Sequence, residues 1–141
     1  MMRVRAYAHP ADEAAVISLW QRCGLTRPWN DPSKDIRRKL AVQPELFLVG
    51  ELDGAIVATA MAGYDGHRGW VNYLAVEPGL QGRGHGRAMM DAAERGLRAA
   101  GCPKINVQVR NGNAAALAFY ARIGFAADEA VSLGKRLEPD G

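Results

Sequence analysis

The stretch of sequence that decides the fold runs from Leu74 to Met90 and reads LAVEPGLQGRGHGRAMM. An apolar run typical of a β-strand ends at Val76, a glycine-rich loop follows, and a helix rich in alanine and methionine is predicted to begin near Gly86. Glycine lets the backbone adopt positive φ and approach a ligand without a Cβ in the way. A helix that begins directly after such a loop points its unpaired N–H groups and its positive dipole end into the loop. The stretch therefore predicts an anion site, most naturally for a phosphate or pyrophosphate.

Length, charge and cysteine content limit the class of protein. At 141 residues we expect one domain, residues 1–141, with a core from about residue 3 to residue 137. The net charge of +3 suits an anionic ligand, but the Lys and Arg residues form no stripe interleaved with aromatics, which argues against nucleic acid. Cys23 and Cys102 are far apart and form no CxxC, so we expect neither a metal site nor a disulfide. There is no apolar run of membrane-spanning length and no signal-peptide pattern, which predicts a cytoplasmic protein that does not bind membranes.

Periodicity and turn signals predict the order β-α-α-β-β-β-α-β-α-β-β. Asp53-Gly54 is a strong hairpin signal, and Asp31 followed by Pro32 is typical of an N-cap and first helical residue. Three antiparallel strands in succession lead into the glycine loop, and the helix after it should return the chain to a parallel strand. The expected fold class is α/β, a mixed sheet with helices on both faces. Ranges are assigned to six of the seven strands, at residues 3–8, 46–52, 55–64, 70–76, 104–110 and 130–137, and helices are expected to begin at Pro10, Pro32, about Gly86 and Ala114.

The glycine loop has alternatives that its own sequence leaves open. It lacks the Gly-Lys-Ser/Thr ending of a phosphate-binding NTPase loop, and it follows antiparallel strands, where a Rossmann first turn would not lie. It could also be a tight strand-to-helix turn that uses glycine only for geometry.

A second motif, VQVRNGNAAALAFYARIGF at residues 107–125, narrows the choice. It places Asn113 at a helix start and Tyr120 seven residues later, two turns along the same face. With both motifs, the chain resembles the GNAT superfamily of N-acetyltransferases, which use acetyl-coenzyme A, and among them small stand-alone bacterial members. The element order is similar from residue 3 to residue 137. The residues that match the family's acyl-CoA signature, Q/R-x-x-G-x-G/A, and its later motif are Gln81, Gly84, Gly86, Asn113, Ala118, Phe119, Tyr120, Gly124 and Phe125.

The resemblance implies a site for acetyl-CoA and no metal. Loop amides would hold the pyrophosphate, and the end of the preceding strand would pair with the pantetheine arm as an added strand. The amide of Val76, or a neighbour, would polarise the acetyl carbonyl. The residues implied to bind acetyl-CoA are Leu74, Ala75, Val76, Gln81, Gly82, Arg83, Gly84, His85, Gly86, Arg87, Asn113 and Tyr120.

The implied mechanism is direct attack of a neutral primary amine on the thioester. Tyr120 is placed by the resemblance to protonate the departing sulfur; alternatively it is a half-buried helix aromatic, and Asn113 a simple N-cap. Many family members carry a glutamate base on the fourth strand, but WVNYLAV has Asn72 and Tyr73 there. Tyr73 is the catalytic candidate on this strand. Asp65, His67 or a water chain past Tyr73 could serve as the base, which stays open.

The acceptor is predicted to bind between the loop that joins the first two helices and the fourth strand. Arg27, Arg68 and Asp31 together would suit an acceptor with both an amine and a carboxylate, whereas Trp29 and Trp70 could merely pack the loop onto the sheet. A small-molecule amine and a protein amine are equally compatible, and a homodimer is possible. The predicted acceptor-binding residues are Trp29, Asn30, Asp31, Tyr64, Asp65, Arg68 and Trp70.

The sequence is compatible with three functions. The leading one is an N-acetyltransferase. The second is a catalytically silent acyl-CoA-binding sensor or interaction module, and the third is a protein that binds a different phosphate ligand, such as a nucleotide.

Overall fold

A computed structural model describes all 141 residues, which fall into two compact units. The first unit comprises Met1–Val107 together with Asp140–Gly141. The second comprises Gln108–Pro139.

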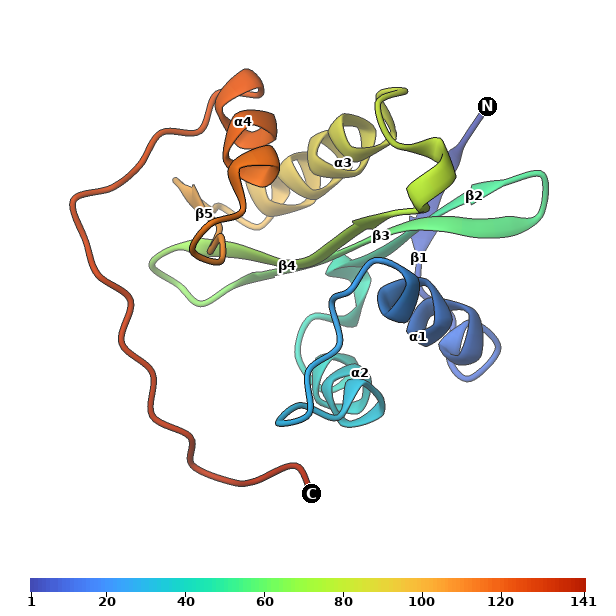
Figure 1. Cartoon of the computed structure of the whole chain (residues 1–141), viewed down its shortest axis with the longest axis horizontal. Helices are drawn as coiled ribbons and strands as arrows, with labels where there is room; N and C mark the ends of the chain where they lie inside the picture. Colours follow the sequence, from blue (N-terminus) through green and yellow to red (C-terminus); the bar gives the residue numbers. More distant parts are fainter. The chain divides into compact units, whose positions relative to one another are not determined.

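The first unit is built on a five-stranded mixed sheet in which the strands lie in chain order (Figure 1). The strands β1 to β4 pair antiparallel, whereas β5 runs parallel to β4. The helix α3 (His85–Ala99) joins β4 to β5. This arrangement confirms both the predicted antiparallel succession and the predicted parallel crossover. The strands are β1 (Arg3–Ala6), β2 (Phe47–Leu52), β3 (Ala55–Tyr64), β4 (Gly69–Val76) and β5 (Ile105–Asn106), and short 3₁₀ turns cover Pro44–Leu46 and Pro78–Leu80.

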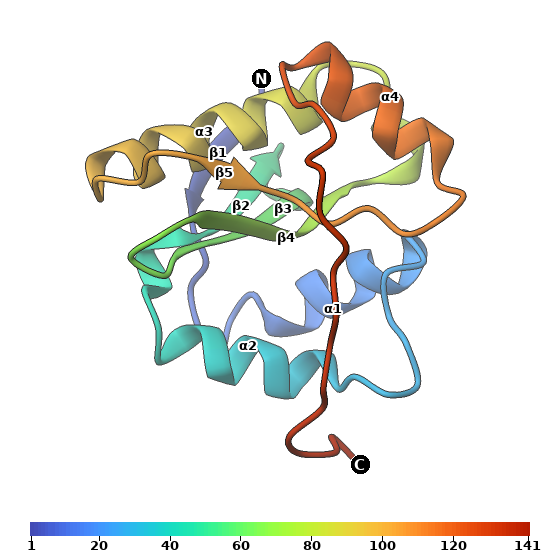
Figure 2. The ribbon, with the colours of Figure 1, turned by 90° about the vertical axis from the view of Figure 1, so that its left-hand side faces the viewer.

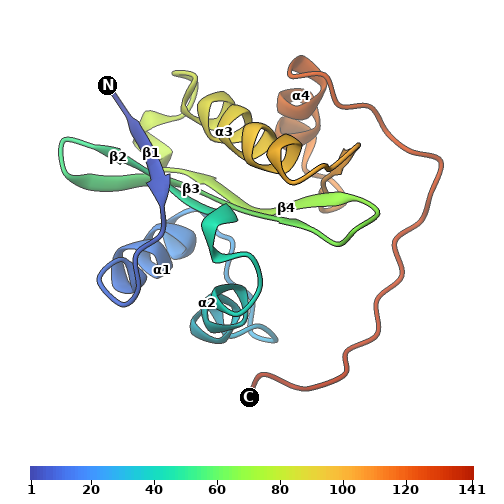
Figure 3. The ribbon, with the colours of Figure 1, turned by 180° about the vertical axis from the view of Figure 1, so that it is seen from behind.

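Helices cover both faces of this sheet, as expected. The helices α1 (Glu13–Arg22) and α2 (Pro32–Leu40) lie on one face and α3 on the other, which Figure 2 shows edge-on and Figure 3 from behind. Trp20 of α1, Ile36 of α2 and Phe47 of β2 are fully buried on one face of the sheet, and Met89 of α3 is fully buried on the other. Each face therefore has its own apolar layer, and the sheet is fixed between them.

Local turn chemistry matches the sequence in two places. Asp53 and Gly54 both have positive φ, 52° and 79°, as a two-residue hairpin turn with right-handed strand twist requires. The Asp31 carboxylate accepts hydrogen bonds from the backbone N–H groups of Ser33 (2.9 Å) and Lys34 (3.3 Å). It caps α2, with Pro32 as the first helical residue.

The first helix begins later than predicted. We expected Pro10 to be its first residue, but α1 begins at Glu13. The Asp12 carboxylate accepts hydrogen bonds from the N–H of Ala8 at 2.8 Å and from the Arg5 guanidinium at 2.6 Å and 3.0 Å. Because these bonds close a turn between β1 and the helix, residues 9–12 lie outside the helix.

The strands after α3 also differ from the prediction. The strand expected at 104–110 is confined to Ile105–Asn106, and residues 126–139, where the last strand or strands were predicted, form none. An alternation of polar and apolar residues is typical of a strand, but a strand also needs a neighbouring strand for its backbone hydrogen bonds, and the pattern does not provide one. The side chains of Val131, Leu133 and Leu137 are exposed along this segment.

The second unit contains the helix α4 (Ala114–Arg122), where one was predicted. Asn113 caps it, since the side-chain oxygen accepts from the N–H of Ala116 at 3.1 Å. None of the four helices has the length and apolarity that crossing a membrane requires.

Candidate active site

The glycine loop turns the chain from the end of β4 into α3. Gly84 is the N-cap of α3 with φ 85°, and no side chain caps this helix. Ala88 donates to the carbonyl of Gly84 at 3.0 Å and is the first N–H inside the helix, so the amides of residues 85–87 have no partner within it. A Cβ on Gly84 would meet no atom within 4 Å. Glycine is therefore required there for backbone conformation, and the surface beside it is open.

The charges around the loop suit an anion. Arg83 and Arg87 are exposed, and His85 is half-buried at the first helical position. Together with the unpaired amides and the positive end of the α3 dipole, they make a site that fits a phosphate group.

The strand β4 carries an irregularity directly before the loop. Its register with β3 shifts, so that Thr59 lies opposite Ala75 and Met61 opposite Asn72. Two β4 residues thus face one residue of β3, which defines a β-bulge. Tyr73 occupies the bulge with φ 51°, in the left-handed region.

Beyond the bulge, one edge of β4 lacks a partner strand. The pairing with β5 is confined to Gly69 and Trp70, and we call the same side of residues 74–76 the open edge of β4. Glu77 donates its N–H to Val57 of β3 at 2.8 Å. Since neighbouring residues in a strand point their backbone groups to opposite sides, the N–H and carbonyl of Val76 are directed to the open edge.

On that side, the Val76 carbonyl forms hydrogen bonds to the loop and to the residue that ends α1. It accepts from the Gln81 side-chain amide at 3.2 Å and from the Cys23 thiol at 3.3 Å. These two bonds hold the strand end against the glycine loop and leave the Val76 N–H as the polar group directed outward.

A buried network holds Tyr73 in its unusual conformation. The Tyr73 ring stacks on Trp20, with centroids 3.8 Å apart and planes inclined by 13°. Thr59 donates its hydroxyl proton to the Tyr73 carbonyl at 2.7 Å and accepts from the Trp20 indole N–H at 2.9 Å. The Tyr73 hydroxyl donates to Oδ2 of Asp35 on α2 at 2.6 Å. Burial and then this carboxylate raise the pKa of Tyr73 above its ordinary value.

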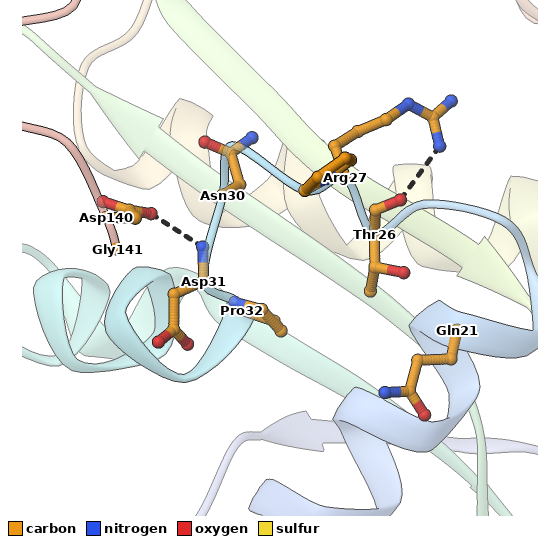
Figure 4. Close-up of a pocket in the computed structure, with 9 residues that line it drawn as sticks. Gln21, Thr26, Arg27, Asn30, Asp31, Pro32, Asp140 and Gly141 are labelled. Carbon is orange, nitrogen blue, oxygen red and sulfur yellow. Dashed lines mark hydrogen bonds between the residues drawn. The ribbon is translucent and has the colours of Figure 1, made fainter.

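A pocket of about 530 Å³ lies beside the loop that joins α1 to α2 (Figure 4). The Arg27 guanidinium turns back onto its own loop and donates to the carbonyls of Gly24 at 2.7 Å and Thr26 at 3.0 Å. Opposite it, the carboxylate of Asp140 accepts from the N–H of Asp31 at 2.7 Å. The lining residues are Gln21, Thr26, Arg27, Pro28, Asn30, Asp31, Pro32, Asp140 and Gly141.

The structure brings some of the predicted acceptor residues together and separates others. Asn30 and Asp31 line the pocket, whereas the Trp29 side chain is 53% exposed and does not line it. The other four lie at or next to the opposite end of β4 from Val76, about 23 Å away at the usual rise per strand residue. These four residues are Tyr64, Asp65, Arg68 and Trp70.

Of the two side chains weighed as a general base, Asp65 is engaged in hydrogen bonds to its own turn. The Asp65 carboxylate accepts from the N–H groups of Arg68 and His67, both at 2.8 Å, and these bonds lower the pKa of Asp65. The His67 ring belongs to this exposed turn. Glu77 forms an ion pair with Arg22 at 2.6 Å.

In the second unit, Tyr120 lies on α4 among aromatic rings. Its ring meets Phe119 and Phe125 edge-on, with centroids 5.1 Å and 5.3 Å away. Burial raises the pKa of the Tyr120 hydroxyl, which therefore stays protonated over a wider pH range.

Sequence reasoning missed four residues that shape this site, namely Trp20, Asp35, Thr59 and Asp140. Trp20 lies on the apolar face predicted for the first helix, a pattern that indicates only a core residue. Asp35 follows Asp31 by four residues, one turn along the same face of α2, and this spacing was the one available signal. The sequence carries no such signal for Thr59 and Asp140, because their partners lie far away along the chain.

Comparison with known families identifies the class of protein. The model of the acetyltransferase (GNAT) family matches residues 13–125, and the chain belongs to this family. It is 48% identical to an acetyltransferase of Yersinia enterocolitica and 48% identical to one of Pectobacterium atrosepticum, in each case over 99% of this chain and 98% of the relative. The chain is thus a GNAT-type acetyltransferase.

Solved structures share the fold at low sequence identity. AAC(6')-Iy, solved with the bisubstrate analogue CoA-S-monomethyl-acetylneamine, matches with a TM-score of 0.80 at 16% identity, over 96% of this chain and 98% of that one. The ribosomal-protein-S18-alanine N-acetyltransferase of Escherichia coli matches with a TM-score of 0.71 at 24% identity, over 88% and 77% of the two chains.

The network around Tyr73 yields a stability prediction. Thr59→Val keeps the side-chain shape but leaves the buried Trp20 N–H without its acceptor and the Tyr73 carbonyl without its donor. We expect the free energy of unfolding to fall by about 1–3 kcal/mol, the usual cost of an unsatisfied buried group. Urea denaturation measures the change. Thr59→Ser retains the hydroxyl and should lose less; equal stability of Thr59→Val and the original protein would contradict the role of the network.

Proposed function

We propose that this acetyltransferase transfers the acetyl group of acetyl-CoA to a primary amine by direct attack of the amine on the thioester. The observation that carries the proposal is that one stretch contains both the open edge of β4 and the uncapped amino end of α3, which begins nine to eleven residues later. An edge of this kind can pair with an amide-bearing arm, and the loop after it can bind a pyrophosphate. Coenzyme A carries both groups in one molecule.

The proposed acetyl-CoA site follows from this geometry. Backbone amides from Gln81 to Arg87 would bind the pyrophosphate, and Leu74, Ala75 and Val76 would pair with the pantetheine arm. The outward N–H of Val76 would then donate to the acetyl carbonyl and stabilise the oxyanion that forms there. The bisubstrate analogue bound by AAC(6')-Iy, which shares the fold, supports a coenzyme A ligand.

In the proposed chemistry the amine nitrogen forms a bond to the acetyl carbon, and the carbon–sulfur bond then breaks. The nitrogen releases its extra proton to water, coenzyme A leaves as a thiolate, and Tyr120 gives its proton to the sulfur and regains one from solvent. Because the pKa of an ordinary thiol is about 8.5, the thiolate leaves fairly well unaided, and the contribution of the acid is modest. Asn113, beyond its capping role, belongs to the proposed acetyl-CoA site.

We propose that Tyr73 positions the amine and does not deprotonate it. Its proton is engaged with Asp35, so its oxygen presents lone pairs that can accept an N–H from the acceptor. Moving a proton from an alkylammonium with a pKa of about 10 to a carboxylate of about 4 would cost about 8 kcal/mol. The acceptor therefore enters from solution as the neutral amine, and the pocket beside the α1–α2 loop is the proposed acceptor site.

The reaction can be tested by thiol release with a panel of amines. We expect free thiol from acetyl-CoA only when an acceptor is present, together with an acetylated product by mass spectrometry. The panel comprises neamine, spermidine, lysine and a peptide with an amino-terminal alanine. Because the neutral amine reacts, kcat/KM should rise between about pH 7 and about pH 9. Calorimetric binding of acetyl-CoA without thiol release for any amine would favour a silent binding module.

A glycine substitution tests the anion site. Gly84→Ala places a Cβ on a residue with φ 85°, which costs about 1–2 kcal/mol and shifts the first-turn amides. We expect the Kd for acetyl-CoA, measured by calorimetry, to rise about tenfold.

Gly79→Ala is the matched control for this variant. Gly79 lies in the same connection, has no positive φ, and has no atom within 4 Å of a Cβ position. Its Kd should stay within about twofold of the original value, since surface substitutions of this kind cost little. Equal affinities of the Gly84→Ala and Gly79→Ala proteins would refute the loop as the pyrophosphate site.

The acid role is tested by Tyr120→Phe. We expect kcat to fall about tenfold to a hundredfold across the accessible pH range, because the leaving thiolate loses its proton donor. Since the raised pKa keeps Tyr120 protonated, the original protein should show no loss of kcat from this group up to about pH 10. Tyr7→Phe, which removes a hydroxyl bonded to His9, is the control. A kcat unchanged at every pH would remove the acid role.

A further inference from the structure

The chain returns at Asp140 to the wall of the proposed acceptor pocket. Its side chain is only 3% exposed. One carboxylate oxygen accepts from the N–H of Asp31 at 2.7 Å, and the other from the Arg38 guanidinium at 2.7 Å. The Lys34 ammonium group donates a hydrogen bond to the main-chain carbonyl of Asp140. Three positions on or next to α2 thus hold a residue more than 100 positions away in the sequence.

The loop that this residue holds has little regular structure. Residues 25–31 lie between α1 and α2 and belong to neither helix. The bonds within the loop are short-range: Arg27 binds the carbonyls of Gly24 and Thr26, and Asn30 donates its N–H to Arg27 at 3.1 Å. Asp140 adds a bond from a distant part of the chain at Asp31, where the loop joins α2. A charged acceptor of low exposure makes such a bond stronger than one between neutral groups.

The same residue connects the pocket to β4 through a chain of polar contacts. The Tyr73 hydroxyl bonds to Asp35 at 2.6 Å, Asp35 pairs with Arg38 at 3.2 Å, and Arg38 pairs with Asp140 at 2.7 Å. Asp140 then accepts from the N–H of Asp31. An unbroken sequence of hydrogen bonds and ion pairs therefore runs from the bulge in the sheet to the pocket wall.

We propose that Asp140 is a positioning residue for the acceptor. It fixes the α1–α2 loop against α2 and, through Arg38 and Asp35, holds the carboxylate that accepts the hydrogen bond of the Tyr73 hydroxyl. The inference rests on the proposed function, since it takes the pocket beside the loop as the acceptor site. Asp140 does not contact the reacting atoms, and it acts on acceptor binding and leaves acetyl-CoA binding unaffected.

The first test measures the loop directly and needs no substrate. In Asp140→Ala, hydrogen exchange of the Asp31 amide, followed by NMR on the full chain, should accelerate by about tenfold or more, because that N–H loses a charged acceptor. Exchange of the Val49 amide, within the paired strands, should stay unchanged, which separates local release from global destabilisation. Asp140→Asn keeps an oxygen acceptor and should show a smaller acceleration.

The second test separates acceptor from donor. With the amine of the panel that gives the fastest thiol release, Asp140→Ala should raise KM for the amine by about tenfold and leave KM for acetyl-CoA within about twofold. Arg38→Met, which interrupts the polar chain in its middle, should raise the same KM. Glu138→Gln, an exposed carboxylate two residues earlier, is the matched control and should change neither value.

The outcomes are distinct. Unchanged Asp31 exchange in Asp140→Ala overturns the positioning role, and so does faster exchange with an unaltered KM for the amine. An equal rise in both KM values overturns it as well, since the residue would then act on the whole site. If the original protein acetylates no amine of the panel, the proposed function fails, while the exchange measurement still decides whether Asp140 holds the loop.

Discussion

The bond on which the site depends joins the hydroxyl of Thr59 to the carbonyl of Tyr73. A tyrosine with left-handed φ inside a strand costs about 1–3 kcal/mol and persists only where its surroundings hold it. Thr59 holds the carbonyl, Trp20 holds the ring and Asp35 holds the hydroxyl. These groups come from β3, α1 and α2, so the apolar layer on one face of the sheet fixes the backbone of the neighbouring strand.

The bulge decides which backbone groups face outward. One extra residue in a strand reverses the direction in which the residues after it point. The bulge adds such a residue to β4 between Asn72 and Ala75. Because β5 pairs only with Gly69 and Trp70, the rest of β4 has no neighbouring strand on that side. The Val76 N–H is therefore directed to an unpaired edge directly before the glycine loop. The short β5 leaves this edge of β4 without a partner strand. The bulge determines which backbone groups of β4 point toward that edge.

The features predicted from the sequence are those in which a few neighbouring residues specify the conformation. Asp53-Gly54 specifies a hairpin turn, and Asp31-Pro32 specifies a helix start. The glycine loop leads into α3 within one residue of the expected position, because a positive φ at Gly84 and the helix after it are encoded in adjacent residues. The GNAT family assignment rested on such local motifs and is confirmed.

The features that could not be predicted depend on residues far apart in the chain. The first helix begins late because Arg5 engages the carboxylate of Asp12. The contact between Tyr73 and Asp35 exists only because the bulge and α2 meet across the sheet face. The absence of a strand at residues 126–139 has the same origin, since a sequence pattern cannot supply a pairing partner.

The position of Gly141 in the pocket wall has a practical consequence for handling the protein. Any peptide fused after this residue would leave the chain from the rim of a pocket of about 530 Å³, beside Asp140 and the start of α2. An affinity tag or fluorescent label there would crowd that opening and alter the electric charge around it. The Met1 side chain, by contrast, is fully exposed ahead of the edge strand β1. Purification handles, surface immobilisation and dye attachment are therefore better placed away from Gly141 and this pocket.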